Sequence, residues 1–302
     1  LGKIISFKGI KKGIENTNYL IRTKKNKYIL TIFEKRVQKR DLPFFMSLMD
    51  KLNNHNINCP KPQKNKIGNY LITIKNKPAS IVSFVEGKDK NKLKIKDCYE
   101  IGKNIAKLHI VSKKIKLYRK NSMSLNSWSK LLNKIGNKYK KIEVNLNELI
   151  KTSFADIKKR WPKKLTSGII HGDLFIDNIF FKKNKFHGYI DFYFAANDFF
   201  MYEIAICINA LCFDKKNRKF IFNRKKSKNF LKGYSSLRKL SKNEKNSLNT
   251  LCKGAALRYL LTRTYDYLNT PKSAIIKIKD PHEYIQKLKV HNKFSNFKNY
   301  YN

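Results

Sequence analysis

The spacing of apolar residues changes character about a third of the way along the chain. Within the first 86 residues, most apolar runs are short and alternate with polar positions, as in strands with one buried face. Residues 42–52 instead place apolar side chains three and four positions apart, which predicts an amphipathic helix. Polar stretches with Gly, Asn or Pro separate these segments and predict turns. The predicted strands are residues 4–7, 19–23, 28–33, 70–74 and 79–85.

From about residue 87 onward the pattern becomes mainly helical. Only residues 169–184 and 185–194 interrupt it, with two short strand-like runs around a polar turn. We therefore predict an α+β, bilobed fold with a small antiparallel β N-lobe over residues 1–86, a larger helical C-lobe over residues 87–302, and a hinge near residues 84–88. Ligands tend to bind in the cleft between two such lobes. The predicted helices are residues 97–112, 125–135, 146–161, 202–213, 229–234, 242–269 and 281–288.

The composition is that of a globular protein. Hydrophobic residues make up 41% of the chain and aromatic residues 13%, which is enough to bury a sizeable core and excludes a disordered chain. No apolar run approaches the roughly 18–20 residues that a membrane span requires, so we predict no membrane association. The chain begins with Leu1 rather than Met, which indicates that a short N-terminal piece is missing.

The net charge is unusual. Lys and Arg number 67 against 21 Asp and Glu, a formal charge of +46, which taken alone points to a nucleic-acid or other anionic partner. However, only ten of the 67 are Arg, and the lysines are spread along the whole chain among many Asn and Ile. Lys, Asn and Ile are encoded by A/T-rich codons, so compositional drift explains this surface better than selection. A basic nucleic-acid-binding protein remains a remote alternative.

The five cysteines do not form a metal-binding pattern. Their number is odd, and the closest pair is five residues apart, outside the usual C-x₂₋₄-C zinc spacing. We predict buried free thiols in a reducing compartment, and hence a cytoplasmic protein. The cysteines are Cys59, Cys98, Cys207, Cys212 and Cys252.

The strongest local signal is the sequence His-Gly-Asp-Leu-Phe-Ile-Asp-Asn at residues 171–178, followed by Asp191. A phosphotransferase needs a carboxylate that orients the attacking hydroxyl and accepts its proton, and oxygen ligands for Mg²⁺. Asp173 and Asn178, five residues apart on one tight loop, can face the same cleft, and Asp191 can complete a metal site. The alternative is a surface loop whose Asp residues cap turns. We interpret His171 as holding the loop by hydrogen bonding.

This loop and the Asp191 segment resemble the aminoglycoside phosphotransferase/choline kinase superfamily, whose fold is protein-kinase-like. Residues 106–109, Ala-Lys-Leu-His, are similar to the A-x-L-H helix end of that superfamily. Further blocks resemble its homoserine kinases, so that the resemblance covers nearly the whole chain. These blocks are residues 6–10, 13–19, 41–45, 190–195, 207–213, 256–263, 265–271 and 279–284.

The resemblance implies ATP-dependent phosphorylation of the side-chain hydroxyl of L-homoserine to O-phospho-L-homoserine, a step of threonine biosynthesis. It implies that Asp173 is the base and that Asn178 and Asp191 hold Mg²⁺. The alternative is another small-molecule kinase of the same fold, acting on choline, methylthioribose or an aminoglycoside. The resemblance does not indicate an oligomeric state.

The resemblance also implies an ATP site. Residues 9–18 would form a hairpin over the phosphates, although a plain β-turn explains the Gly9-x₃-Gly13 spacing equally well. Thr31 falls near the place of the superfamily's basic third-strand residue, and the helix at residues 42–52 contains no Glu to pair with such a residue. Lys35 is a candidate substitute, or one more solvated lysine. The candidate ATP-binding residues are Gly9, Gly13, Asn16, Asn18, Thr31, Ser83 and Val85.

Homoserine carries a carboxylate and an ammonium group, so its site needs a cation and an acceptor. Arg258 and Arg263 are the candidates, because arginine is scarce in this chain and both lie on one predicted helix. The alternative for Arg263 is an intrahelical pair with Asp266, three residues later. A second departure from the superfamily is Glu203, at a position that usually holds Asp; the change keeps the negative charge.

Overall fold

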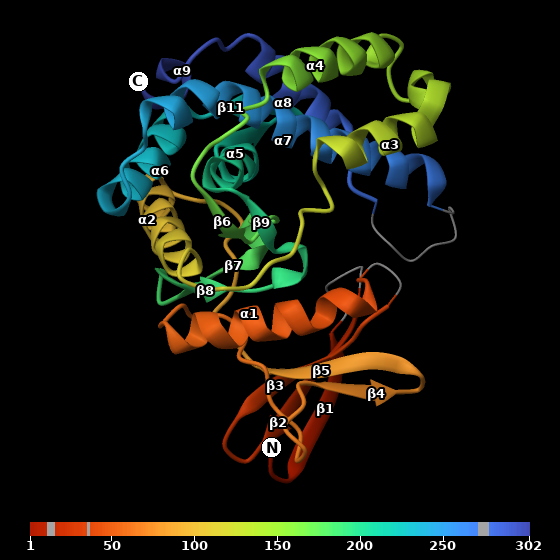
Figure 1. Cartoon of the computed structure of the whole chain (residues 1–302), viewed down its shortest axis with the longest axis vertical. Helices are drawn as coiled ribbons and strands as arrows, with labels where there is room; N and C mark the ends of the chain where they lie inside the picture. The colour runs from red at the N-terminus through yellow and green to blue at the C-terminus, as the bar shows by residue number, and fades with distance from the viewer. Residues whose placement is uncertain (11–15, 35–36, 271–277) are drawn as a thin grey trace.

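The N-terminal part of the protein is one antiparallel sheet with a helix across it. The computed structural model describes residues 1–10, 16–34, 37–270 and 278–302. Figure 1 shows the sheet and helix α1 at one end of the molecule and the other helices at the opposite end. The strand order is β1-β2-β3-β5-β4, and neighbouring strands are antiparallel. The strands are β1 (Ile4–Ile10), β2 (Thr17–Thr23), β3 (Lys27–Ile32), β4 (Leu71–Ile74) and β5 (Lys77–Ser83).

Helix α1 (Leu42–Asn54) confirms the predicted amphipathic helix. Pro43 lies in its first turn, where a missing N–H breaks no intrahelical bond. The apolar stripe, which includes Leu42, Phe45 and Leu52, is buried. The five predicted strands are confirmed as well, each within a few residues of its predicted bounds.

The C-terminal part is built around the central helix α5 (Phe200–Leu211), which is buried on nearly every side. Helix α7 (Lys242–Asn269) packs along α5, and α2 (Ile95–Ser112) packs against α6 (Arg224–Leu237). The α+β, bilobed fold class predicted from the sequence is therefore confirmed. The remaining helices are α3 (Leu125–Ile135), α4 (Leu146–Arg160), α8 (His282–Asn292) and α9 (Lys298–Tyr301).

The predicted helix over residues 202–213 is wrong at its end, because Phe213 begins a hairpin. Strand β10 (Phe213–Lys216) pairs with β11 (Lys219–Phe222) across the two-residue turn Asn217-Arg218. Both turn residues have positive φ, 44° and 65°, which is the turn geometry that two-residue hairpins favour. Lysines stand on both sides of the turn, and three apolar residues follow one another in β11, so the sequence shows no alternation that would reveal the hairpin.

The segment between the two parts of the protein crosses a strand of the C-terminal part at close range. Lys88 exchanges two backbone hydrogen bonds, of 3.1 and 2.9 Å, with Phe181 of β7 (Ile179–Lys182). The preceding Gly87 has φ +105°, and a Cβ there would lie 2.5 Å from the Phe181 carbonyl oxygen. Only glycine fits this approach without displacement.

All five cysteines are buried and free, as predicted. Burial raises the pKa of every one of these thiols, for Cys98 to about 12. None of the helices in the described part of the chain is long and apolar enough to cross a bilayer.

Candidate active site

The His-Gly-Asp loop connects strand β6 (Ser167–Ile170) to the short helix η3 (Ile176–Asn178), from which the chain enters β7. Strand β8 (Lys185–Tyr189) pairs with β7 and leads to Asp191, which immediately precedes the short helix η4 (Phe192–Phe194). Strand β9 (Ala196–Phe199) then returns beside β6. The predicted strand-like runs around a polar turn are thus confirmed as the β7–β8 hairpin. Asn178 lies directly before this hairpin and Asp191 follows it after one residue.

Asp173 and Asn178 are joined within the loop. The Asn178 side-chain amide donates a 2.8 Å hydrogen bond to the backbone carbonyl of Asp173. Asp173 is half-buried, and its carboxylate accepts a 3.0 Å hydrogen bond from the hydroxyl of Tyr259 on α7. The interval of five residues therefore allows a hydrogen bond within the loop, and that the two side chains face one cleft stays a prediction.

Asn178 is also connected to the segment that carries Asp191. Its backbone carbonyl accepts a 3.1 Å hydrogen bond from the N–H of Ile190, the residue before Asp191. Asp191 is exposed and has left-handed backbone angles, φ 66° and ψ 61°, a region that Asp and Asn visit more readily than other residues with side chains. The structure thus brings the neighbourhoods of the two predicted metal ligands together.

Gly172 is required by the shape of the loop. Its φ is +79°, and a Cβ at this position would lie 2.7 Å from the carbonyl oxygen of Phe194. The Gly172 carbonyl oxygen accepts a 2.8 Å hydrogen bond from the guanidinium of Arg258, which is 3% exposed. Any other residue at position 172 would strain the backbone directly before Asp173.

His171 ties the loop to the strand end before Asp191. Its Nε2 lies 2.9 Å from the carbonyl oxygen of Ile190. Burial lowers the pKa of His171, so the ring is neutral at pH 7 and donates from Nε2 to this carbonyl. The hydrogen-bonding role predicted for His171 is confirmed.

Glu203, on the central helix α5, holds the backbone of the same loop through hydrogen bonds. From α5 its carboxylate accepts hydrogen bonds from the backbone N–H groups of His171 (2.6 Å) and Gly172 (2.8 Å). The side chain is fully buried, and burial alone would raise its pKa. Its hydrogen bonds, above all the one with His109, outweigh burial and hold the pKa below its ordinary value. We conclude that Glu203 is ionised in the folded protein.

The His109 ring completes this anchor. It stacks on Phe200 with ring centroids 4.3 Å apart, and its Nδ1 lies 2.8 Å from the hydroxyl of Tyr234. Burial lowers the pKa of His109, so the neutral ring accepts from Tyr234 and donates to Glu203 across 3.4 Å. The A-x-L-H helix end noted in the sequence therefore supports the loop from α2.

Replacing Glu203 with Gln should lower the free energy of unfolding by about 3 kcal/mol, because a buried amide presents an N–H₂ group where two backbone donors need an acceptor. Since the pKa of Glu203 is lowered on folding, this stabilisation is present above the ordinary value of 4.5 and is lost as the pH falls through the lower folded value. Urea unfolding of both proteins at pH 7 measures the difference. Glu148→Gln, on the exposed face of α4, is the matched control, and equal effects of the two substitutions would contradict the anchoring role.

Three of the candidate ATP-binding residues, Asn16, Asn18 and Thr31, are joined in a series of hydrogen bonds, which we call the polar ladder. Thr31, buried in β3, donates a 2.8 Å hydrogen bond to the side-chain oxygen of Asn18 on β2. The Asn18 amide donates to the Asn16 carbonyl, and the Asn16 side chain accepts from the backbone N–H of Glu34. No cation stands at the position of Thr31, as the sequence indicated.

The other ATP candidates lie at the two ends of the sheet. Gly9 is an exposed residue inside β1, where a Cβ would make only ordinary contact with Tyr19, while Gly13 and Lys35 lie outside the described residues. Ser83 closes β5 and exchanges two 2.8 Å hydrogen bonds with the backbone of Lys61. Val85 follows it and is 5% exposed.

The two candidate substrate arginines are both engaged by other groups. Arg258 donates to the loop at Gly172, as described above. Arg263 donates to Glu283 of α8 at 2.6 Å and to the carbonyl of Asp280, in the segment before α8, at 3.2 Å. Their predicted role in substrate binding stays a prediction.

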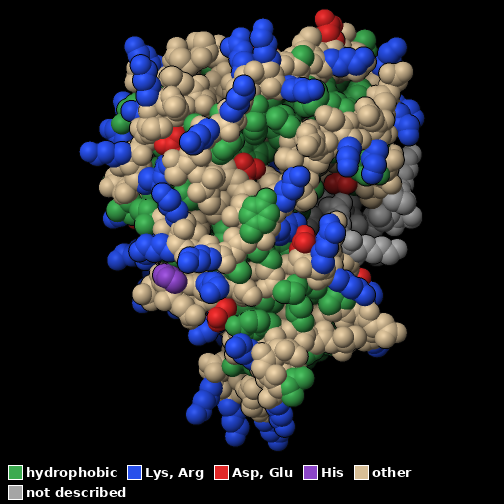
Figure 2. Space-filling view, in the orientation of Figure 1, with side chains coloured by type: hydrophobic (Ala, Val, Ile, Leu, Met, Phe, Trp, Pro, Cys, Tyr) green, Lys and Arg blue, Asp and Glu red, His purple; other side chains and the backbone are tan. Residues whose placement is uncertain are grey.

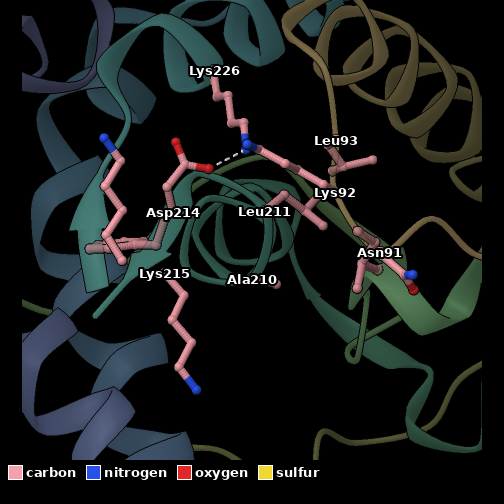
Figure 3. Close-up of a pocket in the computed structure, with 11 residues that line it drawn as sticks. Asn91, Lys92, Leu93, Ala210, Leu211, Asp214, Lys215 and Lys226 are labelled. Carbon is pink, nitrogen blue, oxygen red and sulfur yellow. Dashed lines mark hydrogen bonds and ion pairs between the residues drawn. The ribbon is translucent and has the colours of Figure 1, made fainter. Parts of the chain in front are cut away.

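A pocket of about 330 Å³ adjoins the loop at Ile176 (Figure 3). Its floor is the end of α5, and its walls carry Asp214 of β10 together with several lysines. Lys226 forms a 2.6 Å ion pair with Asp214, and Lys92 also reaches toward this carboxylate in Figure 3. Burial alone would raise the pKa of Asp214, but hydrogen bonds from Asn223 and Lys226 lower it. The pocket's carboxylate is therefore ionised and already paired.

Comparison with known proteins assigns the family. The chain matches the model of the phosphotransferase enzyme family over residues 6–224. It is 42% identical over 300 residues to a homoserine kinase of Agrobacterium fabrum (strain C58), which covers 99% of this chain and 92% of the relative. A homoserine kinase of Mesorhizobium japonicum is 42% identical over 291 residues, covering 96% and 90%. The chain belongs to the homoserine kinases of the phosphotransferase enzyme family.

Solved structures show the same fold at much lower sequence identity. Amicoumacin kinase, in a complex with AMP-PNP and Ca²⁺, superposes with a TM-score of 0.75 at 14% identity, covering 96% of this chain and 89% of the other. Choline kinase from Cryptosporidium parvum gives a TM-score of 0.67 at 17% identity, covering 96% and 88%. The kinase-like fold implied by the resemblance is confirmed, and membership of the homoserine kinase family agrees with the blocks noted in the sequence.

The contacts of two residues near the loop of this homoserine kinase family member were not predicted from its sequence. The first is Tyr259, which donates to Asp173. The second is Arg119, which donates to Asp41 at the start of α1 (2.8 Å) and to the Ala195 carbonyl after η4 (3.0 Å). Partners 76 to 86 residues apart leave no trace in local spacing. Glu203 could have been found, because one acid in an otherwise apolar helix indicates a buried, paired carboxylate.

Proposed function

We propose that this protein transfers the γ-phosphoryl group of ATP to the side-chain hydroxyl of L-homoserine, forming O-phospho-L-homoserine. The observation that carries the proposal is the identity of 42% to a protein named homoserine kinase over 99% of this chain. The loop geometry supports it, because the Asp173 carboxylate, the Asn178 amide and the Asp191 carboxylate are carried by the β7–β8 hairpin and by the segments directly before and after it. We place the reaction in the cytoplasm, where ATP and reduced thiols occur.

Asp173 acts as the base in this proposal. Its carboxylate would accept a hydrogen bond from the homoserine hydroxyl, orient the oxygen toward the γ-phosphorus, and take the proton as the new O–P bond forms. The bond from the γ-phosphorus to the bridging oxygen breaks, and ADP leaves. Glu203, His171 and Arg258 would act indirectly: their hydrogen bonds hold the backbone of the loop and so fix the position of Asp173.

Mg²⁺ fits the residues that the loop brings together. The N–H₂ group of Asn178 donates to the Asp173 carbonyl, so its amide oxygen is the atom that would bind the metal. Asp191 would add a carboxylate. Oxygen atoms of these two kinds are ligands that Mg²⁺ prefers in nucleotide sites. We propose that Asn178 and Asp191 hold Mg²⁺, which when bound neutralises phosphate charge.

The nucleotide would bind between the sheet and the loop. We assign residues 1–86 to nucleotide binding, with Ser83 and Val85 near the adenine. Gly9, close to the end of β1, and Gly13, in the chain between β1 and β2, would lie over the phosphates. Residues 87–302 would supply the catalytic loop and the acceptor site. The ladder of Asn16, Asn18 and Thr31 offers hydrogen bonds but no positive charge, so the metal would carry more of the charge neutralisation. Arg258 and Arg263 remain the candidates for the homoserine carboxylate.

The proposal is tested by ADP release with Mg·ATP and a panel of acceptors: homoserine, choline, methylthioribose and kanamycin. We expect homoserine to give by far the highest kcat/KM, with Asp173→Asn as the control for background ATP hydrolysis. Preference for another acceptor would contradict the homoserine assignment and leave the kinase assignment intact.

The alternative of a nucleic-acid-binding protein depends on the charge alone. Figure 2 shows Lys and Arg distributed over the visible face rather than gathered in one basic patch. Such a distribution fits compositional drift better than a dedicated binding surface. Salt-sensitive DNA or RNA binding, together with no transfer to any acceptor, would favour this alternative.

A further inference from the structure

Tyr259 lies outside the loop motif and has no role in the function proposed above. Its hydroxyl donates a hydrogen bond of 3.0 Å to Oδ1 of Asp173 and lies 3.5 Å from the carbonyl oxygen of Gly172. The residue is 7% exposed. Helix α7, which carries it, is 28 residues long and packs along the central α5, so the hydroxyl is presented from the rigid interior of the protein.

The ring of Tyr259 is fixed on three sides. Phe175 of the loop meets it edge to face, with ring centroids 4.9 Å apart, and Tyr284 of α8 lies at 5.1 Å. The guanidinium carbon of Arg258 lies 4.7 Å from the ring centroid. These contacts leave the side chain little freedom to turn, so the direction of its O–H group is set by packing.

The charge state of Tyr259 suits a donor. Burial raises the pKa of its hydroxyl well above 10, although the neighbouring Arg258 acts in the opposite direction. Among the described residues, other ionisable groups that face this pair include Tyr202 of α5, Tyr284 of α8 and, toward Asp173, His171. Tyr259 is therefore a neutral hydroxyl that can donate one hydrogen bond, and Asp173 receives it.

We propose that Tyr259 is a positioning residue for the base. By donating to Oδ1, it fixes the rotation of the Asp173 carboxylate and leaves Oδ2 to face the substrate hydroxyl. The terminal torsion of an aspartate is broad and nearly two-fold, so without a fixed donor the carboxylate would sample many orientations. This inference rests on the assignment of Asp173 as the base, but it does not depend on which alcohol is the acceptor.

Tyr259→Phe tests the proposal because it removes the donor and keeps the ring and its packing. We expect kcat to fall about 10- to 100-fold, since a misoriented base loses much of its effect, with little change in KM for ATP or for the acceptor. Tyr139→Phe is the matched control: it is also a buried tyrosine, its hydroxyl has no hydrogen-bond partner among the described residues, and it lies far along the chain in residues 136–141. The control should retain wild-type kcat.

A double-mutant cycle separates positioning from a structural role. If Tyr259 acts through the Asp173 carboxylate, Tyr259→Phe should have no further effect on the residual rate of Asp173→Asn. An equal fold-loss in both backgrounds, or a wild-type kcat for Tyr259→Phe, would overturn the proposal. If the enzyme phosphorylates another acceptor instead of homoserine, the same cycle is run with that acceptor. Failure of the homoserine assignment is thereby distinguished from failure of the role proposed for Tyr259.

The contact itself can be observed without turnover. In protein labelled with [ζ-¹³C]tyrosine, the Tyr259 signal is the one of 16 that is missing in Tyr259→Phe. Asp173→Ala should shift this signal and leave the Tyr139 signal in place. A Tyr259 signal that does not respond to Asp173→Ala would show that the hydrogen bond is absent in solution and would overturn the proposal.

Discussion

Asp173→Asn should lower kcat by about two to four orders of magnitude while the affinity for ATP stays nearly unchanged. Asparagine keeps the size of the side chain and an oxygen that can accept from Tyr259, so the loop should keep its shape. The amide cannot take the proton of the attacking hydroxyl, and that proton moves only as the reaction proceeds. Initial rates of ADP release give kcat, and titration calorimetry gives the ATP affinity.

Asp177→Asn is the matched control for this substitution, because it removes the other carboxylate of the same loop. We interpret Asp177 as a turn residue without a role in the reaction, so its variant should retain wild-type kcat. Near-normal turnover of Asp173→Asn would show that another group takes the proton. Equal losses of kcat in Asp173→Asn and Asp177→Asn would show that the rate depends on the negative charge of the loop rather than on Asp173 as a base.

Asp191→Asn should damage metal binding rather than proton transfer. At low Mg²⁺ we expect a loss of activity of about 100-fold, partly recovered when Mg²⁺ is raised or Mn²⁺ is supplied, because a carboxylate ligand has become a neutral amide. Asparagine is the appropriate replacement, since it tolerates the left-handed backbone at position 191. Activity as a function of metal concentration measures the effect.

Asn178→Ala should act as a milder form of the same defect. It removes a neutral ligand, together with the hydrogen bond to the Asp173 carbonyl. The response to added metal distinguishes these two variants from Asp173→Asn, whose loss should not be recovered at any concentration of Mg²⁺. Full activity of Asp191→Asn at low Mg²⁺ would contradict its assignment as a ligand.

The sequence predicted those parts of the molecule that depend on local spacing. The alternation of apolar positions predicted the five strands, and the three-and-four spacing in residues 42–52 predicted α1, because each pattern directly describes which face is buried. The loop at residues 171–178 was predictable for the same reason: Asp173 and Asn178 are joined by a bond within five residues, so their geometry is largely a property of the segment itself.

Contacts between distant segments were not predictable in this way. The donor for Asp173 comes from Tyr259, 86 residues later, and the partner of Arg263 is Glu283 rather than Asp266, which the helical interval suggested. Which of several acids an arginine meets depends on how α7 and α8 pack, and that packing is decided by the whole core. The β10–β11 hairpin was missed because its turn residues, Asn217 and Arg218, stand between lysines that mask any alternation.

The burial of all five cysteines has a practical consequence for observing this protein at work. With every native thiol enclosed and its pKa raised, maleimide reagents have no fast-reacting target on the folded chain. A cysteine introduced at the 80% exposed Ile67, beside the N-terminal sheet, and another at the 78% exposed Val144, between α3 and α4, would therefore be labelled selectively. A dye pair at these two positions would report the separation of the sheet from the helical part, without any native cysteine having to be removed.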